Sequence, residues 1–255
     1  MSTGLTLPPR PPKPRTTGRT HAIDKGAGPS AVADLLAIAA AHLDLVKLGW
    51  GTAVVTAGLE EKIALYRDHD VDVCLGGTLW ELHHLQGRLD EYTGWLQELG
   101  LTTVEISDGA VALEPGEKSD LITRFAEHFT VLSEVGSKDA DAIVTPAEWV
   151  AAIRRELDAG AAYVILEGRE SGSAGMYRPS GEIRMGLIGE IIDAGIDVDR
   201  LVFEAPQKSQ QVWLLDRVGP AINLANIALD EIVSVETLRL GLRADTLLRL
   251  HGDDA

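Results

Sequence analysis

The chain has 255 residues, 45% of them hydrophobic, and its 23 Lys and Arg against 39 Asp and Glu give a formal net charge of −16. This charge gives no support to a nucleic-acid partner, and the sequence holds no run of about 18 uncharged apolar residues that would span a membrane. The single cysteine, Cys74, excludes an internal disulfide, so we expect a soluble cytoplasmic protein.

The first 18 residues differ from the rest of the chain. Five prolines are interleaved with three basic residues between positions 8 and 15, and no apolar stretch follows them as a secretory signal would require. Such a segment has too little apolar surface to fold by itself. We therefore predict a flexible tail over residues 1–18 and a single domain over residues 19–255.

After this tail, short apolar runs typical of strands alternate with helical patterns to the end of the chain. The expected strands cover residues 20–24, 43–48, 71–75, 102–107, 130–134, 163–167, 201–204 and 221–224. The expected helices cover residues 31–42, 59–69, 79–99, 117–128, 146–159, 185–194, 209–218 and 229–250. Eight strand–helix repeats in about 250 residues predict a (β/α)8 TIM-type barrel, which we favour over a doubly wound open sheet.

Four of the strand-like runs end on a glutamate: Glu105, Glu134, Glu167 and Glu204. Successive members lie 29 to 37 residues apart, the length of one strand–helix repeat, so we expect them at the same end of successive parallel strands. A carboxylate at the tip of a buried strand is costly unless a cation or hydrogen bonds compensate it. The alternatives are one shared cation site and four separate ion pairs, and the repeated placement favours the shared site.

Basic, hydroxyl and amide side chains occur at the same strand ends, where TIM-type barrels place their active sites and phosphate-binding loops. The candidates for ligand binding are Lys25, Lys47, Arg169, Lys208, Ser209 and Asn226. Ser209 is also explained as the cap of the helix that follows it. The pair Gly76-Gly77 is either a turn that approaches an anion or a plain turn. Carboxylates with other oxygen ligands suit Mg²⁺, so we predict a site of mixed charge that binds this ion.

Several longer strings are more specific than this pattern. They are Asp24-Lys25-Gly26, 46–52, 76–79, 104–109, Glu134-Val135-Gly136, 167–172, 203–212 and 223–227. Together they resemble the phosphosulfolactate synthase family, whose members add sulfite to phosphoenolpyruvate. The resemblance extends from about residue 20 to about residue 246, and the string at 203–212 is the most specific part of it.

This resemblance implies a Mg²⁺-dependent barrel enzyme, a carbon–sulfur lyase acting in the synthetic direction. Its expected partners are phosphoenolpyruvate, sulfite and further copies of the same chain in a homo-oligomer. Glu105, Glu134 and Glu167 are implied as the metal shell, with Glu204 outside it on the substrate side. Arg169, Lys208, Ser209 and Asn226 are the implied phosphate side, Lys25 and Lys47 attract sulfite or the substrate carboxylate, and Lys138 is the acid that protonates C2.

The chain departs from the family pattern at two positions. Ser137 stands directly before Lys138, where consecutive lysines are expected, and Ala244 replaces a glycine. The first departure leaves the identity of the acid open. Two other functions remain as alternatives: a barrel of the same family with another nucleophile or acceptor, and a non-enzymatic, stress-related protein that binds a partner. The four glutamates together with Lys25, Lys47 and Arg169 favour an enzyme.

Overall fold

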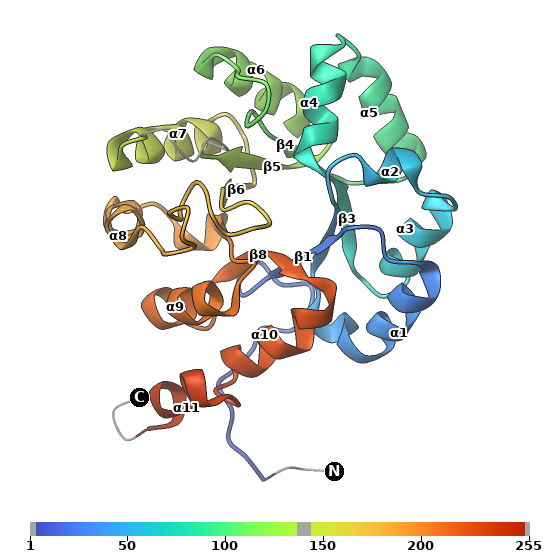
Figure 1. Ribbon diagram of the computed structural model, residues 1–255. Helices are drawn as coiled ribbons and strands as arrows, with labels where there is room; N and C mark the ends of the chain where they lie inside the picture. The colour runs from blue at the N-terminus through green and yellow to red at the C-terminus, as the bar shows by residue number, and fades with distance from the viewer. Residues whose placement is uncertain (1–3, 137–143, 253–255) are drawn as a thin grey trace.

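The computed structural model describes residues 4–136 and 144–252, and the eight strands in these segments are all parallel. They are β1 (Thr20–Asp24), β2 (Leu45–Leu48), β3 (Asp72–Leu75), β4 (Thr103–Ile106), β5 (Thr130–Val135), β6 (Tyr163–Leu166), β7 (Leu201–Glu204) and β8 (Asn223–Ala228). The pairing order is β3-β2-β1-β8-β7-β6-β5-β4, and β3 contacts β4 where the two ends of this series meet. The sheet is therefore a nearly closed barrel (Figure 1), which confirms the predicted fold.

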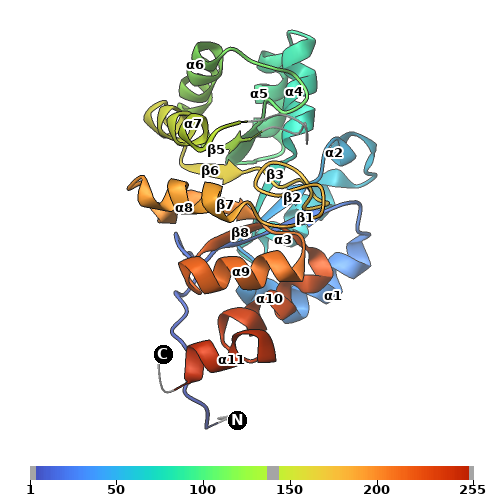
Figure 2. The same cartoon turned by 60° about the vertical axis from the view of Figure 1, so that its left-hand side comes forward.

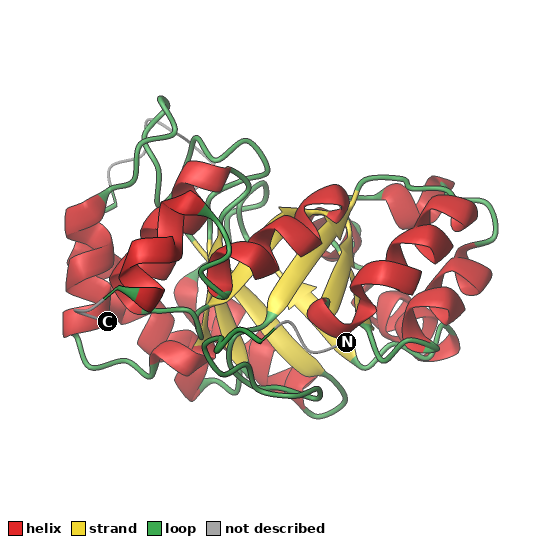
Figure 3. Ribbon diagram, turned by 90° about the horizontal axis from the view of Figure 1, so that it is seen from below, coloured by secondary structure: helices red, strands yellow, loops and turns green. Residues whose placement is uncertain are grey.

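Helices follow the strands and cover the outside of the barrel, as Figure 3 shows in a view from below. They are α1 (Pro29–Ala39), α2 (Thr52–Val55), α3 (Leu59–Arg67), α4 (Gly77–Leu85), α5 (Leu89–Glu98), α6 (Pro115–Ala126), α7 (Pro146–Asp158), α8 (Met185–Asp193), α9 (Lys208–Val218), α10 (Ile232–Arg239) and α11 (Ala244–His251). Three short 3-10 turns lie at Ala40–His42, Val198–Arg200 and Leu229–Glu231. None of the helices in the described segments is long and apolar enough to cross a membrane.

Two of the expected helices are each divided into two shorter helices in the structure. The pattern over residues 79–99 predicts one helix, but the structure has α4 and α5, because Gly87 adopts a left-handed φ of 67° between them. The pattern over residues 229–250 is interrupted in the same way at Gly241, where φ is 66°. A left-handed residue ends an α-helix, and glycine adopts this conformation without steric cost. The apolar spacing continues through both breaks, so periodicity alone does not reveal them.

The main core lies between the sheet and the helices, and a second, smaller apolar cluster fills the barrel itself. The inner cluster consists of Leu45, Cys74, Leu132, Ile165, Val202 and Ala225, with Tyr163 packed against it. These side chains point inward because successive residues of a strand face opposite sides of the sheet. The next inward position along each strand lies nearer its C-terminal end, and there the polar residues begin.

The basic N-terminal segment contacts the N-terminal end of the barrel, beside α10 (Figure 2). Arg10 forms an ion pair of 2.8 Å with Glu236, and Arg15 forms one of 2.9 Å with Asp44. Lys13 donates at 2.7 Å to a backbone carbonyl just before β2. These side chains thus have specific partners on the domain, which the expectation of a flexible tail does not include.

Glu236 makes the attachment of this segment depend on pH. Burial alone would raise its pKa, but Arg10 and, more weakly, His42 hold the pKa below its ordinary value of about 4.5. The carboxylate therefore stabilises the fold above that value, and this stabilisation is lost as the pH falls through the lowered pKa. We expect Glu236→Gln to lower the thermal midpoint at about pH 7 and to have a progressively smaller effect as the pH falls below about 4. The exposed Glu182→Gln serves as control, and a pH-independent effect of Glu236→Gln would contradict the assignment.

Candidate active site

A pocket of about 470 Å³ lies at the C-terminal ends of the strands. All four strand-tip glutamates line it, so the spacing in the sequence correctly places them at one end of the barrel. Three of the candidate binding residues, Lys47, Arg169 and Asn226, line the same pocket. Trp50 and Thr78 also line it, and they belong to the strings 46–52 and 76–79, which give neither residue a role of its own.

Lys47 is the buried cation of the pocket. Its Nζ lies 3.1 Å from Oε2 of Glu105 and 3.3 Å from Oε1 of Glu204. Burial would lower the pKa of this amine, but Glu105, Glu204 and Glu134 together raise the pKa well above its ordinary value. Lys47 is therefore a permanent ammonium at neutral pH, which attracts anions and cannot serve as a base.

Glu105 is held by a backbone amide as well as by Lys47. Its Oε1 accepts a hydrogen bond of 2.7 Å from the N–H of Gly77, the first residue of α4. Burial, reinforced by Glu134, raises the pKa of Glu105, while Lys47 and Gly77 oppose this shift. The double glycine of the sequence does approach an anion closely, and that anion is Glu105 of the protein itself.

Gly77 has no room for a side chain, which gives a test of this contact. A Cβ at this position would lie 2.5 Å from Cβ of Ser107 and 3.1 Å from Oε1 of Glu105. We expect Gly77→Ala to destabilise the fold by about 1–3 kcal/mol and to lower kcat, because Glu105 must move. The matched control is Gly94→Ala in α5, where a Cβ would meet no atom within 4 Å. Thermal unfolding and turnover are measured for both variants. Similar stability and similar kcat of the two variants would contradict the close contact at Gly77.

Glu167 and Glu204 shape the loop that follows β6. Oε1 of Glu167 accepts a hydrogen bond of 2.6 Å from the N–H of Arg169, and Oε2 of Glu204 accepts one of 2.9 Å from Gly168. The hydroxyl of Tyr177 donates to the backbone carbonyl of Glu204. Arg169 adopts a left-handed φ of 57°, and its exposed side chain lies at the mouth of the pocket.

Asn226 is buried in the pocket wall because of an irregularity in β8. Thr20 of β1 pairs with Leu224, whereas Ala22 pairs with Ile227, so β8 contains one extra residue in this stretch. Asn226 lies there with a φ of 55°. Its Oδ1 is buried and has no hydrogen-bond partner within the described segments. A β-bulge of this kind re-aims a side chain, here toward the pocket.

Two buried charged residues that the sequence does not single out support the strand tips. Lys118 of α6 donates to the backbone carbonyl of Glu134 at 2.6 Å and forms ion pairs of 2.9 Å with both Asp108 and Glu156. Glu81 of α4 accepts hydrogen bonds from Ser107 and from two backbone amides of the loop after β4. Both residues lie on helix faces whose apolar pattern gives no sign of a buried charge.

The structure does not bring every predicted residue to the pocket. Lys25 is exposed after β1, and Lys208 is paired with Asp245 of α11 at 2.9 Å. Ser209 is exposed inside α9, whose N-cap is Gln207, so the capping role considered for Ser209 is wrong. None of these three lines the pocket. Lys138 lies outside the described residues, so its role stays a prediction.

The fold is similar to that of several solved enzymes. The crystal structure of a 3-hexulose-6-phosphate synthase matches with a TM-score of 0.54 at 16% identity, covering 87% of this chain and 98% of that one. The carboxyl transferase domain of Rhizobium etli pyruvate carboxylase matches with a TM-score of 0.58 at 12% identity, covering 86% of this chain and 41% of that one. At these identities the similarity is one of fold alone.

Sequence comparison is more specific. A phosphosulfolactate synthase of Bacillus subtilis is 42% identical over 244 residues, covering 95% of this chain and 97% of its own length. One from Methanothermobacter thermautotrophicus is 44% identical over 250 residues, covering 96% of each chain. The family model of (2R)-phospho-3-sulfolactate synthase (ComA) matches residues 8–245, a range that contains all eight strands and the pocket between their tips. The chain therefore belongs to the (2R)-phospho-3-sulfolactate synthase family.

Proposed function

We propose that this protein adds sulfite to C3 of phosphoenolpyruvate, giving (2R)-O-phospho-3-sulfolactate, and so acts as a carbon–sulfur lyase in the synthetic direction. The observation that carries the proposal is the permanent ammonium of Lys47 within a ring of strand-tip carboxylates. This reaction brings the anions sulfite and phosphoenolpyruvate together and moves negative charge onto the carboxylate of phosphoenolpyruvate. A site for it must supply fixed positive charge at the point where the new negative charge develops.

The bond changes define what the residues must do. The sulfur lone pair of sulfite attacks C3, a C–S bond forms, and the electron pair of the C2–C3 double bond moves toward C2 and the substrate carboxylate. A proton then adds to C2. In this scheme Lys47 stabilises the negative charge on the substrate carboxylate, and the planar fork of Arg169 binds the phosphate together with Asn226. Lys208 and Ser209 lie outside the pocket and are not assigned to this contact.

The charges of the pocket fit the binding of Mg²⁺. Among the described residues, its lining includes five carboxylates, the strand-tip glutamates and Glu170, and two cations, Lys47 and Arg169. Anionic substrates would be repelled by this excess unless a further cation were bound, and oxygen donors are the ligands that Mg²⁺ prefers. Glu134 and Glu167, with Glu105 beside them, would hold the ion. When bound, it supplies Lewis-acid stabilisation of the charge that develops on the substrate carboxylate.

Protonation of C2 is assigned to a group other than Lys47. The carboxylates around Lys47 raise its pKa, so it releases its proton too reluctantly to be an efficient acid near neutral pH. Lys138 keeps the role of acid that the family resemblance implies. We expect both Lys138→Met and Lys138→Arg to stop product formation, because methionine has no proton to give and the guanidinium of arginine does not release one near neutral pH. Product formation by Lys138→Arg close to that of the parent protein would contradict the role of acid.

The reaction is tested by following the enol absorbance of phosphoenolpyruvate in the ultraviolet. We expect this absorbance to fall only when the enzyme, sulfite and Mg²⁺ are all present, and to stop falling when a chelator is added. Chromatography of the product checks that sulfur has been added to carbon. Product formation with another nucleophile but not with sulfite would refute the proposed reaction and favour a different activity of the same barrel.

Glu134→Gln separates an enzyme from a partner-binding protein. The substitution keeps the shape of the side chain and removes its negative charge, so it is expected to abolish Mg²⁺-dependent turnover while the thermal midpoint changes little. An effect confined to binding of a protein partner, with no activity in the parent protein, would favour the non-enzymatic alternative.

A further inference from the structure

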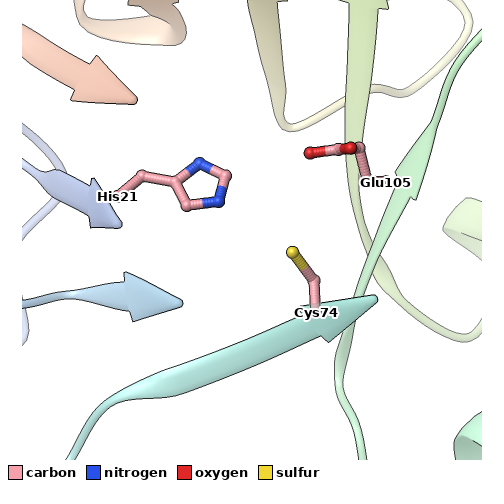
Figure 4. A group of neighbouring side chains, drawn as sticks. All are labelled: His21, Cys74 and Glu105. Carbon is pink, nitrogen blue, oxygen red and sulfur yellow. The ribbon is translucent and has the colours of Figure 1, made fainter. Parts of the chain in front are cut away.

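A second group of potential metal ligands lies below the pocket, inside the barrel. His21 of β1, Cys74 of β3 and Glu105 of β4 point toward one another across the interior (Figure 4). One ligand atom from each lies within 4.8 Å of the other two. All three side chains are buried, with exposed fractions of 3%, 0% and 1%.

His21 is the unusual member of this group. It faces the apolar cluster that fills the barrel, yet its Nε2 is buried without a hydrogen-bond partner within the described segments. An unsatisfied buried nitrogen of this kind costs about 1–3 kcal/mol. Burial, with Lys47 and Arg19 nearby, lowers the pKa of His21 well below its ordinary value. The imidazole is therefore neutral, which is the form that binds a metal.

The donor types differ from those of the pocket above. A thiolate and an imidazole bind borderline and soft divalent ions such as Zn²⁺, whereas Mg²⁺ prefers oxygen ligands only. The ligand atoms around a tetrahedral zinc ion lie roughly 3.5 Å apart. Small side-chain movements would bring His21, Cys74 and Glu105 to this spacing and leave the fourth position for water.

Glu105 connects this group to the catalytic pocket. Its Oε1 accepts the hydrogen bond from Gly77, and its Oε2 is 3.1 Å from the ammonium of Lys47. Lys47 also pairs in register with Cys74 on the neighbouring strand, so the ammonium lies beside the group. A divalent cation bound to Glu105 would be repelled by this ammonium. The carboxylate of Glu105 therefore cannot bind the metal ion and keep its close ion pair with Lys47 at the same time.

We propose that His21, Cys74 and Glu105 form a binding site for a thiophilic divalent cation of the Zn²⁺ type, and that its occupation inhibits the enzyme by drawing Glu105 away from Lys47. On binding, the thiol of Cys74 loses its proton to solvent and the sulfur forms a bond to the metal. The inhibition, unlike the binding, rests on the proposed function of the pocket.

Binding is tested with Co²⁺ as a spectroscopic probe of the reduced, full-length protein. Cys74 is the only cysteine of the chain, so any thiolate-to-cobalt charge-transfer band in the near ultraviolet reports on this residue alone. We expect such a band to saturate at one ion per chain and to be displaced by Zn²⁺. We expect His21→Gln to weaken Co²⁺ binding by at least about tenfold. Absence of the band from the parent protein, or an unchanged titration of His21→Gln, would overturn the site.

Inhibition is tested separately, by measuring turnover with saturating Mg²⁺ and increasing Zn²⁺. We expect Zn²⁺ to lower kcat and a chelator followed by fresh Mg²⁺ to restore it. Cys74→Ser keeps the size of the side chain, and it is expected to retain basal turnover while needing at least about tenfold more Zn²⁺ for the same inhibition. Equal sensitivity of this variant would overturn the inhibitory role. The cobalt titration requires no turnover, so failure of the proposed reaction would leave the binding result intact.

Discussion

Replacing Lys47 by methionine is expected to lower kcat/KM by about a thousandfold, the loss caused by removing a preorganised charge from a developing anion. Lys47 is the buried cation beside Glu105 and Glu204, so the variant has no ammonium to stabilise the substrate carboxylate. Both the affinity for substrate and kcat should fall, because the charge acts on the substrate before the reaction and still more on the charge that develops during it. Steady-state kinetics at saturating Mg²⁺ measures the two effects separately.

A second pair of variants separates this effect from damage to the fold. Lys47→Met leaves two carboxylates without their buried partner, which is expected to lower the thermal midpoint. Adding Glu105→Gln removes one of these charges and should recover much of the lost stability without restoring turnover. The comparison Lys25→Met removes an exposed lysine outside the pocket and is expected to change kcat/KM far less. Equal losses in the Lys25 and Lys47 variants would contradict the central position of Lys47.

Lys118→Met is expected to destabilise the fold by about 3 kcal/mol and to raise the Mg²⁺ concentration needed for half-maximal turnover. The substitution leaves Asp108 and Glu156 without their buried cation, and it removes the donor that holds the backbone carbonyl of Glu134. Lys118 does not line the pocket and acts only by positioning the tip of β5. Chemical denaturation measures the first effect, and turnover as a function of Mg²⁺ concentration measures the second.

The control for this prediction comes from the same helix. Arg124 of α6 pairs with Asp90 at the surface, where the two side chains are 47% and 90% exposed. Exposed pairs contribute at most about 1 kcal/mol, so Arg124→Met should change stability little and leave the Mg²⁺ dependence unaltered. If Lys118→Met lowered stability but kept the Mg²⁺ dependence of the parent protein, Lys118 would be a structural residue without a positioning role.

Much of the architecture follows from local properties of the chain. Each strand is a short aliphatic run and each helix has its own apolar spacing, so eight repeats are countable without knowledge of their contacts. The rule that parallel strands place their C-terminal ends together then locates Glu105, Glu134, Glu167 and Glu204 at one mouth. The structure confirms this grouping because nothing beyond the order and direction of the strands is needed to produce it.

The details of the site depend instead on contacts between distant segments. The interaction of Lys47 with Glu204 joins residues 157 positions apart. The pairing of β1 with β8 brings their strands together, because it leaves only these two strands between β2 and β7. Asn226 reaches the pocket through a bulge that changes the register by one residue. Lys208, in contrast, pairs with Asp245 of α11 and does not line the pocket.

The sequence by itself thus determined the barrel, the family and the end of the barrel at which the glutamates lie, since repeat length, strand pattern and specific strings are properties of contiguous residues. The tertiary structure decided which polar side chains meet: Lys47 with two glutamates, Lys118 with the tip of β5, and His21 with Cys74 and Glu105. Such pairings depend on stagger, bulges and helix orientation, and these are fixed by the packing of the whole chain.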